Sequence, residues 1–168
     1  GEELYRSTRA FIQPFSLKQF LLLVCGEIGR SEDVNRLYEL IMRDCPSFVH
    51  ESMVSILKEI GKENCYIVTQ SDEEYQKDKV TRTGLQDLVQ EVIIVSGSKK
   101  EAIESLCAYF PSEEIIFVDD KQKFFDDIDM KKCKNLRTIL YNENGLSALK
   151  SGIEASRKVR RDDVNQQC

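Results

Sequence analysis

The sequence predicts an α/β protein with a parallel sheet flanked by helices. Four short apolar runs rich in β-branched residues occur after the first third of the chain, at positions 65–68, 92–95, 115–118 and 136–140. Short, continuously apolar runs are typical of strands buried on both faces. Helical patterns separate these runs, and strands that alternate with helices indicate a parallel sheet with right-handed crossovers.

The chain before His50 has the hydrophobic period of helices instead. Ser16 is expected to cap a helix over residues 17–28, which stops at Gly29, and Ser31 is expected to cap the next helix, which Pro46 ends. The apolar face of that second helix comprises Val34, Leu37, Tyr38 and Ile41. A third helix is expected to end at Gly61.

We therefore divide the 168 residues into three parts. Residues 1–50 are expected to form a mostly helical segment, residues 51–155 an α/β core, and residues 156–168 a polar C-terminal tail. A turn at Asn144–Gly145 is expected before the last helix. This length is enough to bury a core without disulfides or structural metals.

Composition excludes several classes of function. The net charge of −5 argues against general nucleic-acid binding. The longest apolar stretch, Phe20–Cys25, is far too short to span a bilayer, so no membrane partner is expected. The six cysteines form no Cys-x-x-Cys pair, and several lie in apolar runs, as buried thiols do. Reduced thiols indicate a cytoplasmic protein.

Polar residues follow three of the predicted strands. Thr69 follows the first strand, Lys99 lies shortly after the second, and the pair Asp119–Asp120 follows the third. In a parallel sheet these positions share the carboxyl edge, where ligands bind. A hydroxyl and a lysine suit a phosphate group, and two carboxylates suit Mg²⁺. Each residue alone is more often a helix cap or a surface charge, so the prediction rests on their combination.

The order of these residues resembles the haloacid dehalogenase superfamily of phosphohydrolases. The second motif of that family is similar to 65–69, with Gln70 where Asn is frequent; the third is similar to Lys99 at a helix start; the fourth is similar to 116–120. The resemblance implies a three-layer Rossmann-like parallel sheet with a small helical cap. It also implies that Thr69, Gln70 and Lys99 bind the phosphate of a small phosphorylated substrate, while Asp119 and Asp120 bind Mg²⁺.

One element of the family pattern is missing. Its first motif is a strand that ends in Asp-x-Asp, which supplies the nucleophile, and the start of this chain has no such pattern. Either the chain begins after that motif, so that Gly1–Tyr5 continues from it, or Cys25 and Glu27 replace the two acids within 21–27. The missing strand lies in the middle of the family sheet, and its absence would expose the edges of neighbouring strands.

Two other classes of function remain open. A non-catalytic relative that lost the nucleophile would bind a phosphate ligand or another protein. A response-regulator receiver also uses an acidic pair, a threonine and a lysine, but there the acidic pair follows the first strand, so the order in this chain does not fit. Neither the substrate nor the oligomeric state follows from the sequence.

Overall fold

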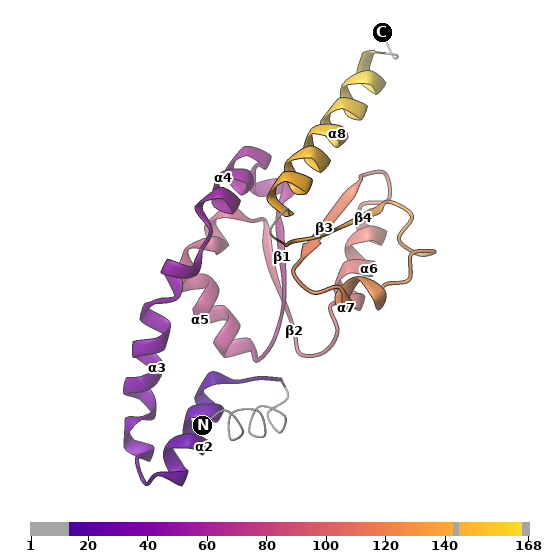
Figure 1. The fold of residues 1–168 in the computed structure, drawn as a ribbon. Helices are drawn as coiled ribbons and strands as arrows, with labels where there is room; N and C mark the ends of the chain where they lie inside the picture. Colours follow the sequence, from indigo (N-terminus) through magenta and orange to yellow (C-terminus); the bar gives the residue numbers. More distant parts are fainter. Residues whose placement is uncertain (1–13, 143–144, 166–168) are drawn as a thin grey trace. The chain divides into compact units, whose positions relative to one another are not determined.

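The computed structural model describes residues 14–142 and 145–165 (Figure 1). The chain divides into two compact units, Gly1–Lys99 and Lys100–Cys168, and each is described separately. Three sequence expectations concern positions outside the described residues: the continuation at Gly1–Tyr5, the turn residue Asn144, and the end of the tail, 166–168.

Helices form the beginning of the first unit, as the sequence predicts. Their bounds are α2 (Leu17–Glu27), α3 (Val34–Arg43) and α4 (Glu51–Ile60). The predicted cap of α2 is confirmed, because the Ser16 hydroxyl accepts a hydrogen bond from the Gln19 amide at 3.5 Å. Gly61 ends α4 with a φ of 95°, a backbone conformation that side chains disfavour.

The predicted cap at Ser31 is wrong. Residues Ser31–Asp33 form a 3₁₀ turn, and α3 begins two residues later than expected, at Val34. Asp33 precedes the helix but makes no side-chain cap bond. Its carboxylate instead accepts two hydrogen bonds from Arg36, at 3.1 and 2.9 Å, and also pairs with Arg30. The Asp33 carboxylate is therefore bound by guanidinium groups and does not cap α3.

The helices α2 and α3 pack against each other around a small apolar core. Its fully buried members are Leu17, Leu21, Cys25, Val34, Tyr38 and Met42. Two of the four positions expected on the apolar face of α3, Val34 and Tyr38, are thus buried, and Leu37 is packed against the core. Ile41 is 47% exposed, and Met42 takes its place in the core. The hairpin formed by α2 and α3 therefore has an apolar side chain, that of Ile41, outside its core.

The first unit continues into a strand–helix–strand element. Its bounds are β1 (Tyr66–Gln70), α5 (Glu73–Thr83) and β2 (Glu91–Val95). The strands are parallel, with Thr69 opposite Ile94 and Gln70 opposite Val95. All five side chains of β1 are half-buried, where the continuous apolar run had predicted burial on both faces.

The second unit repeats the alternation of helices and parallel strands. Its elements are α6 (Lys100–Tyr109), β3 (Ile115–Asp119), α7 (Lys123–Asp126), β4 (Leu136–Leu140) and α8 (Gly145–Asn165). Strands β3 and β4 are parallel, with Asp119 opposite Leu140. The predicted tail overlaps α8, which continues through residue 165.

The α/β class and the parallel pairing are confirmed. All four predicted apolar runs are strands, and helices occupy the segments between them. Within the described residues the strands form two sheets of two strands each, with orders β1–β2 and β3–β4. These two sheets do not by themselves show the single three-layer sheet that the family resemblance implies.

Candidate functional site

Thr69 and Gln70 are the last two residues of β1 rather than the first residues after it. The chain leaves the sheet at Ser71, whose amide still donates to the Val95 carbonyl at 3.1 Å. The Ser71 hydroxyl donates to the Phe15 carbonyl, so the segment before α2 is bonded to the carboxyl end of β1. This strand end therefore has a defined structure built from residues 56 positions apart.

Acidic residues occupy the start of α5, directly after this strand end. The Asp72 carboxylate caps the helix and accepts a hydrogen bond from the Tyr75 amide at 2.9 Å. Glu73 and Glu74 follow in the first turn. Negative side chains stabilise a helix N-terminus, but they also repel a phosphate there. Any anion at β1 would need positive charge from elsewhere.

A buried amide lies at the same place. Gln76 is 4% exposed, and its side-chain nitrogen donates to the Gln70 carbonyl at 3.4 Å. Within the described part of the chain its Oε1 atom has no hydrogen-bond partner. A buried acceptor without a donor lowers stability, so this glutamine is an exception in an otherwise bonded strand end.

Lys99 lies in the connection between β2 and α6, one residue before that helix. Its side chain is half-buried, and the preceding residues 96–98 are exposed. Lys99 thus lies immediately before the predicted helix, and its role as a site residue stays a prediction. The competing lysine, Lys100, is the first residue of α6 and pairs with Glu104 at 3.9 Å.

The two members of the acidic pair have different environments. Asp119 ends β3 and is 8% exposed; its Oδ1 atom accepts a hydrogen bond from the Lys121 amide at 2.9 Å, and its carbonyl accepts one from the Tyr141 amide at 2.7 Å. Asp120 is exposed. Part of the function of Asp119 is thus to shape the turn after β3, while Asp120 is available to solvent.

The predicted site residues fall in both units. Thr69, Gln70 and Lys99 belong to the first unit, and Asp119 and Asp120 belong to the second. Among the described residues, no group of three or more His, Cys, Asp or Glu side chains is arranged to hold a metal ion. Two adjacent carboxylates fit Mg²⁺ as partial ligands, because this ion keeps several waters and shares a substrate phosphate.

The alternative first motif at Cys25 and Glu27 is wrong. Both residues belong to α2 rather than to a strand end, and Cys25 is 1% exposed in the core of the helical hairpin. A nucleophile must reach its substrate, and a thiol enclosed by leucines does not. The segment 21–27 is therefore part of a helix, as its helical periodicity predicts, and not the strand that its apolar run also allowed.

Cys65 and Cys107, which lie in or beside apolar runs of the sequence, are buried in the structure. Burial raises the pKa of Cys65, with a smaller contribution from Glu63. Burial and a hydrogen bond with Cys133 raise the pKa of Cys107 to about 12. Since the thiolate is the reactive form, these cysteines act as small core residues.

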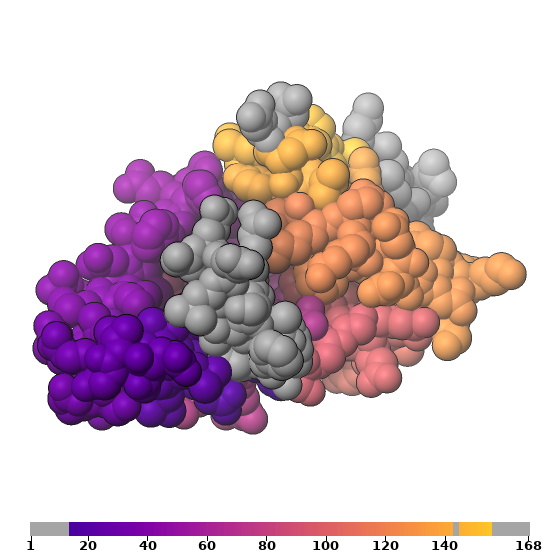
Figure 2. All heavy atoms as spheres, turned by 60° about the horizontal axis from the view of Figure 1, so that its bottom comes forward, coloured from indigo at the N-terminus to yellow at the C-terminus, as the bar shows by residue number. Residues whose placement is uncertain are grey.

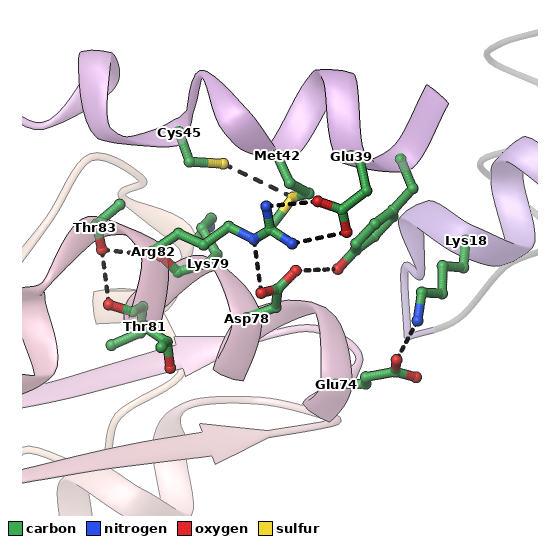
Figure 3. A network of polar contacts seen from close by, with 12 residues as sticks. Lys18, Glu39, Met42, Cys45, Glu74, Asp78, Lys79, Thr81, Arg82 and Thr83 are labelled. Carbon is green, nitrogen blue, oxygen red and sulfur yellow. Dashed lines mark hydrogen bonds and ion pairs between the residues drawn. The ribbon is translucent and has the colours of Figure 1, made fainter. Parts of the chain in front are cut away.

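The sequence interpretation missed a polar network between α3 and α5 (Figure 3). The Tyr38 hydroxyl donates to Asp78 at 2.8 Å. Arg82 donates to the other oxygen of Asp78 at 2.7 Å and forms a pair of hydrogen bonds with Glu39, both at 2.9 Å. Lys18 pairs with Glu74 beside this network. The i, i+4 spacing of Asp78 and Arg82 is the one part that the sequence shows.

The network shifts the pKa values of its members. Burial, followed by the hydrogen bond to Asp78, raises the pKa of Tyr38, so its hydroxyl stays protonated and remains a donor. Burial acts to raise the pKa of Asp78, but the bonds from Arg82 and Tyr38 outweigh it and lower that pKa. Bonds to Glu39 and Asp78 raise the pKa of Arg82. Tyr38 therefore stays protonated, while Asp78 and Arg82 stay charged, across the neutral range.

Comparison of the chain with protein-family models, with curated proteins and with solved structures finds no match in any of the three. In the part of the chain that the structure describes, no helix combines the length and apolar character that crossing a membrane requires.

Proposed function

We propose that this chain supplies the phosphate- and metal-binding groups of a Mg²⁺-dependent phosphohydrolase of the haloacid dehalogenase-like superfamily. The observation that carries the proposal is the order of residues at the strand ends. Thr69 lies at the carboxyl end of β1, Lys99 lies just before α6, and Asp119–Asp120 lies at the carboxyl end of β3. The substrate would be a small phosphorylated molecule in the cytoplasm.

The same proposal includes a more detailed fold than the two separate sheets. In it, β1–β2 and β3–β4 are parts of one three-layer Rossmann-like sheet, and the helical segment up to residue 50 is a small cap. Support comes from the two separate parallel pairs, since a sheet whose middle strand is absent leaves pairs of this kind. Two-stranded sheets are marginal alone, so each pair would gain stability from a further strand.

In this proposal each residue has a defined chemical role. The Thr69 hydroxyl and the Gln70 side chain donate hydrogen bonds to phosphoryl oxygens, and the Lys99 ammonium balances their charge. The carboxylates of Asp119 and Asp120 hold Mg²⁺, which would neutralise charge on the transferring group. Stabilisation of a phosphoryl group is mostly electrostatic, so these groups would provide much of the rate acceleration.

The reaction also needs a carboxylate nucleophile. Because Cys25 lies in a helical core, the proposal places the nucleophilic aspartate in sequence upstream of Gly1 in a longer polypeptide. That polypeptide should hydrolyse a generic aryl phosphate, and Lys99→Ala should abolish the activity. The sequence of the natural gene upstream of Gly1 tests the placement directly: an Asp-x-Asp at the end of an apolar run supports it, and a native start at Gly1 contradicts it.

Ligand binding can be tested on the chain itself. Thermal unfolding is measured with Mg²⁺, with inorganic phosphate, and with both. We expect both together to raise the Tm by several degrees, because a ligand that binds only the folded state stabilises it. Asp120→Asn should remove the Mg²⁺-dependent part, and Lys99→Ala the phosphate-dependent part.

Asp127→Asn is the matched control, because Asp127 is another exposed aspartate in the segment after β3. It should leave both effects unchanged. If Asp120→Asn behaves like Asp127→Asn while the wild type responds to Mg²⁺, the acidic pair is structural and the metal assignment fails.

A non-catalytic binding domain is the second candidate. Two observations favour it: Asp119 already accepts a hydrogen bond from the Lys121 amide, and Asp72, Glu73 and Glu74 place negative charge beside Thr69. Under this alternative the longer polypeptide does not hydrolyse aryl phosphates. Phosphate raises the Tm of the chain if the domain binds a phosphate ligand, and leaves it unchanged if the domain binds another protein.

A further inference from the structure

One side of α3 carries three apolar residues, of which Leu37 packs partly against the hairpin core while Leu40 and Ile41 are exposed. We define the α3 stripe as Arg36, Leu37, Leu40, Ile41 and Asp44. Residues at this spacing share one side of a helix, next to the side that carries Val34, Tyr38 and Met42. Leu40 is 40% exposed and Ile41 is 47% exposed. The stripe is therefore an apolar surface at the outside of the hairpin.

Large exposed apolar residues are concentrated in this part of the first unit. The hairpin of α2 and α3, at the indigo end of the colour scale in Figure 2, contributes Leu22, Leu23, Ile28, Leu40 and Ile41. Exposed apolar residues of this kind are ordinary on a protein surface, so the α3 stripe is distinguished by its charges and not by its apolar area.

The charges at the two ends of the stripe indicate what binds it. Arg36 stands at its beginning and Asp44 at its end, with the apolar residues between them. If a second α3 lies antiparallel, centred on Leu40, each Arg36 meets the Asp44 of the other protomer. The stripe is thus complementary to itself in charge as well as apolar at its centre, which a two-fold interface requires.

The present partners of these charges do not prevent such pairing. Arg36 bonds Asp33 at 2.9 Å, and Asp44 pairs with Arg43 at 3.4 Å, with the side chains of Arg36 and Asp44 both 62% exposed. The Arg43–Asp44 pair is exposed on both sides and contributes little free energy. Asp33 keeps its ion pair with Arg30 when Arg36 turns to the other protomer.

We propose that the α3 stripe is the interface of a homodimer in which two α3 helices pack antiparallel around Leu40. This interface is independent of the proposed enzymatic function. The helix is about 15 Å long, at 1.5 Å per residue, so the contact is smaller than the roughly 800 Å² per partner of a stable complex. The dimer is accordingly weak, with a Kd on the order of 10 µM to 1 mM.

Sedimentation equilibrium over a range of chain concentrations tests the interface. We expect the wild type to pass from monomer to dimer, and Leu40→Glu to weaken association about a hundredfold, because it places two like charges opposite each other at the centre. Leu22→Glu is the matched control: Leu22 is also an exposed leucine of the hairpin, at 52%, but lies outside the α3 stripe. It should dimerise like the wild type.

A charge exchange tests the antiparallel arrangement itself. Arg36→Glu and Asp44→Arg should each weaken the dimer about tenfold. The double variant R36E/D44R should restore it, since the charges are again opposite across the two-fold axis. Within one helix the two positions are about 12 Å apart, too far for a direct contact to explain the rescue.

Thermal melts followed by circular dichroism verify that each variant is folded, which exposed substitutions should permit. A wild type that stays monomeric at millimolar concentration overturns the proposal. So does a dimer that Leu22→Glu weakens as much as Leu40→Glu, or one that the double charge variant fails to restore.

Discussion

Asp78 has two strong donors in the described structure, the Tyr38 hydroxyl at 2.8 Å and the Arg82 guanidinium at 2.7 Å. One donor comes from α3 and the other from α5 itself, so this carboxylate joins the helical hairpin to the strand–helix–strand element. Arg82 extends the connection to Glu39 through a bidentate pair. A hydrogen bond that involves a charged group contributes more than a neutral one, which makes Asp78 the central residue of the network.

Replacing Asp78 by asparagine should lower the free energy of unfolding at pH 7 by about 1–3 kcal/mol, because Arg82 loses a charged partner while half-buried. Urea unfolding followed by circular dichroism measures this. Glu74→Gln is the control: its pair with Lys18 is largely exposed, and we expect a loss of about 0.5 kcal/mol or less. Equal losses for the two variants would contradict a central function of Asp78.

The same variant has a predictable pH dependence. Because the pKa of Asp78 is lower in the folded chain than in the unfolded one, its contribution is complete above the unfolded value of about 3.9 and disappears as the pH falls through the folded value. The difference in unfolding free energy between wild type and Asp78→Asn should therefore shrink on acidification below about pH 4. A difference that is constant from neutral to strongly acidic pH would exclude this linkage.

At the scale of elements, the sequence predicted the strands and the cap of α2, because neighbouring residues determine both. The strands are apolar, β-branched runs, and the structure extends them by only a residue or two: β1 includes Thr69 and Gln70, and β3 includes Asp119. The Ser16 cap also follows from its neighbours alone. Ser31 is not a cap because it begins a 3₁₀ turn, so that Asp33 is the residue before α3, and a capping pattern does not distinguish such a turn from the start of an α-helix.

Polar residues after a strand illustrate a limit of site prediction. Position and residue type correctly place Thr69 and Asp119 at strand ends. Neither indicates that Ser71 is used to bond the Phe15 carbonyl, or that Gln76 is buried beneath the same turn. Such contacts join residues distant in sequence, and spacing within one segment carries no information about them.

Two substitutions at Asp72 separate its contribution as a helix cap from the effect of its negative charge. Asp72→Ala removes the acceptor of the Tyr75 amide and should destabilise the chain by about 1 kcal/mol. Asp72→Ser keeps a capping oxygen, so it should recover most of that loss while removing one negative charge beside Thr69. Urea unfolding of the two variants makes the comparison, and equal stabilities would show that the cap contributes nothing.

At the scale of the whole molecule, the alternation of strands and helices was predictable, but the distribution of strands between sheets was not. Each strand is specified by five or so neighbouring residues, whereas its pairing depends on segments far along the chain. The two compact units meet in sequence between Lys99 and Lys100, directly after the exposed residues 96–98. The cap-and-core boundary expected near residue 50 instead lies inside the first unit, where Tyr38 and Asp78 bond across it.

This organisation predicts where a protease cuts first. Exposed connections of small residues between compact units are preferred sites of limited proteolysis, and Ser96, Gly97 and Ser98 form such a connection followed by two lysines. Brief trypsin treatment should cleave after Lys99 or Lys100 and give two fragments that mass spectrometry assigns to the two units. The variant K99Q/K100Q should slow that cleavage without changing the melting profile. First cleavage at Lys131 or Lys132, in the exposed segment between α7 and β4, would instead show that this segment is more accessible to the protease than the connection between the units.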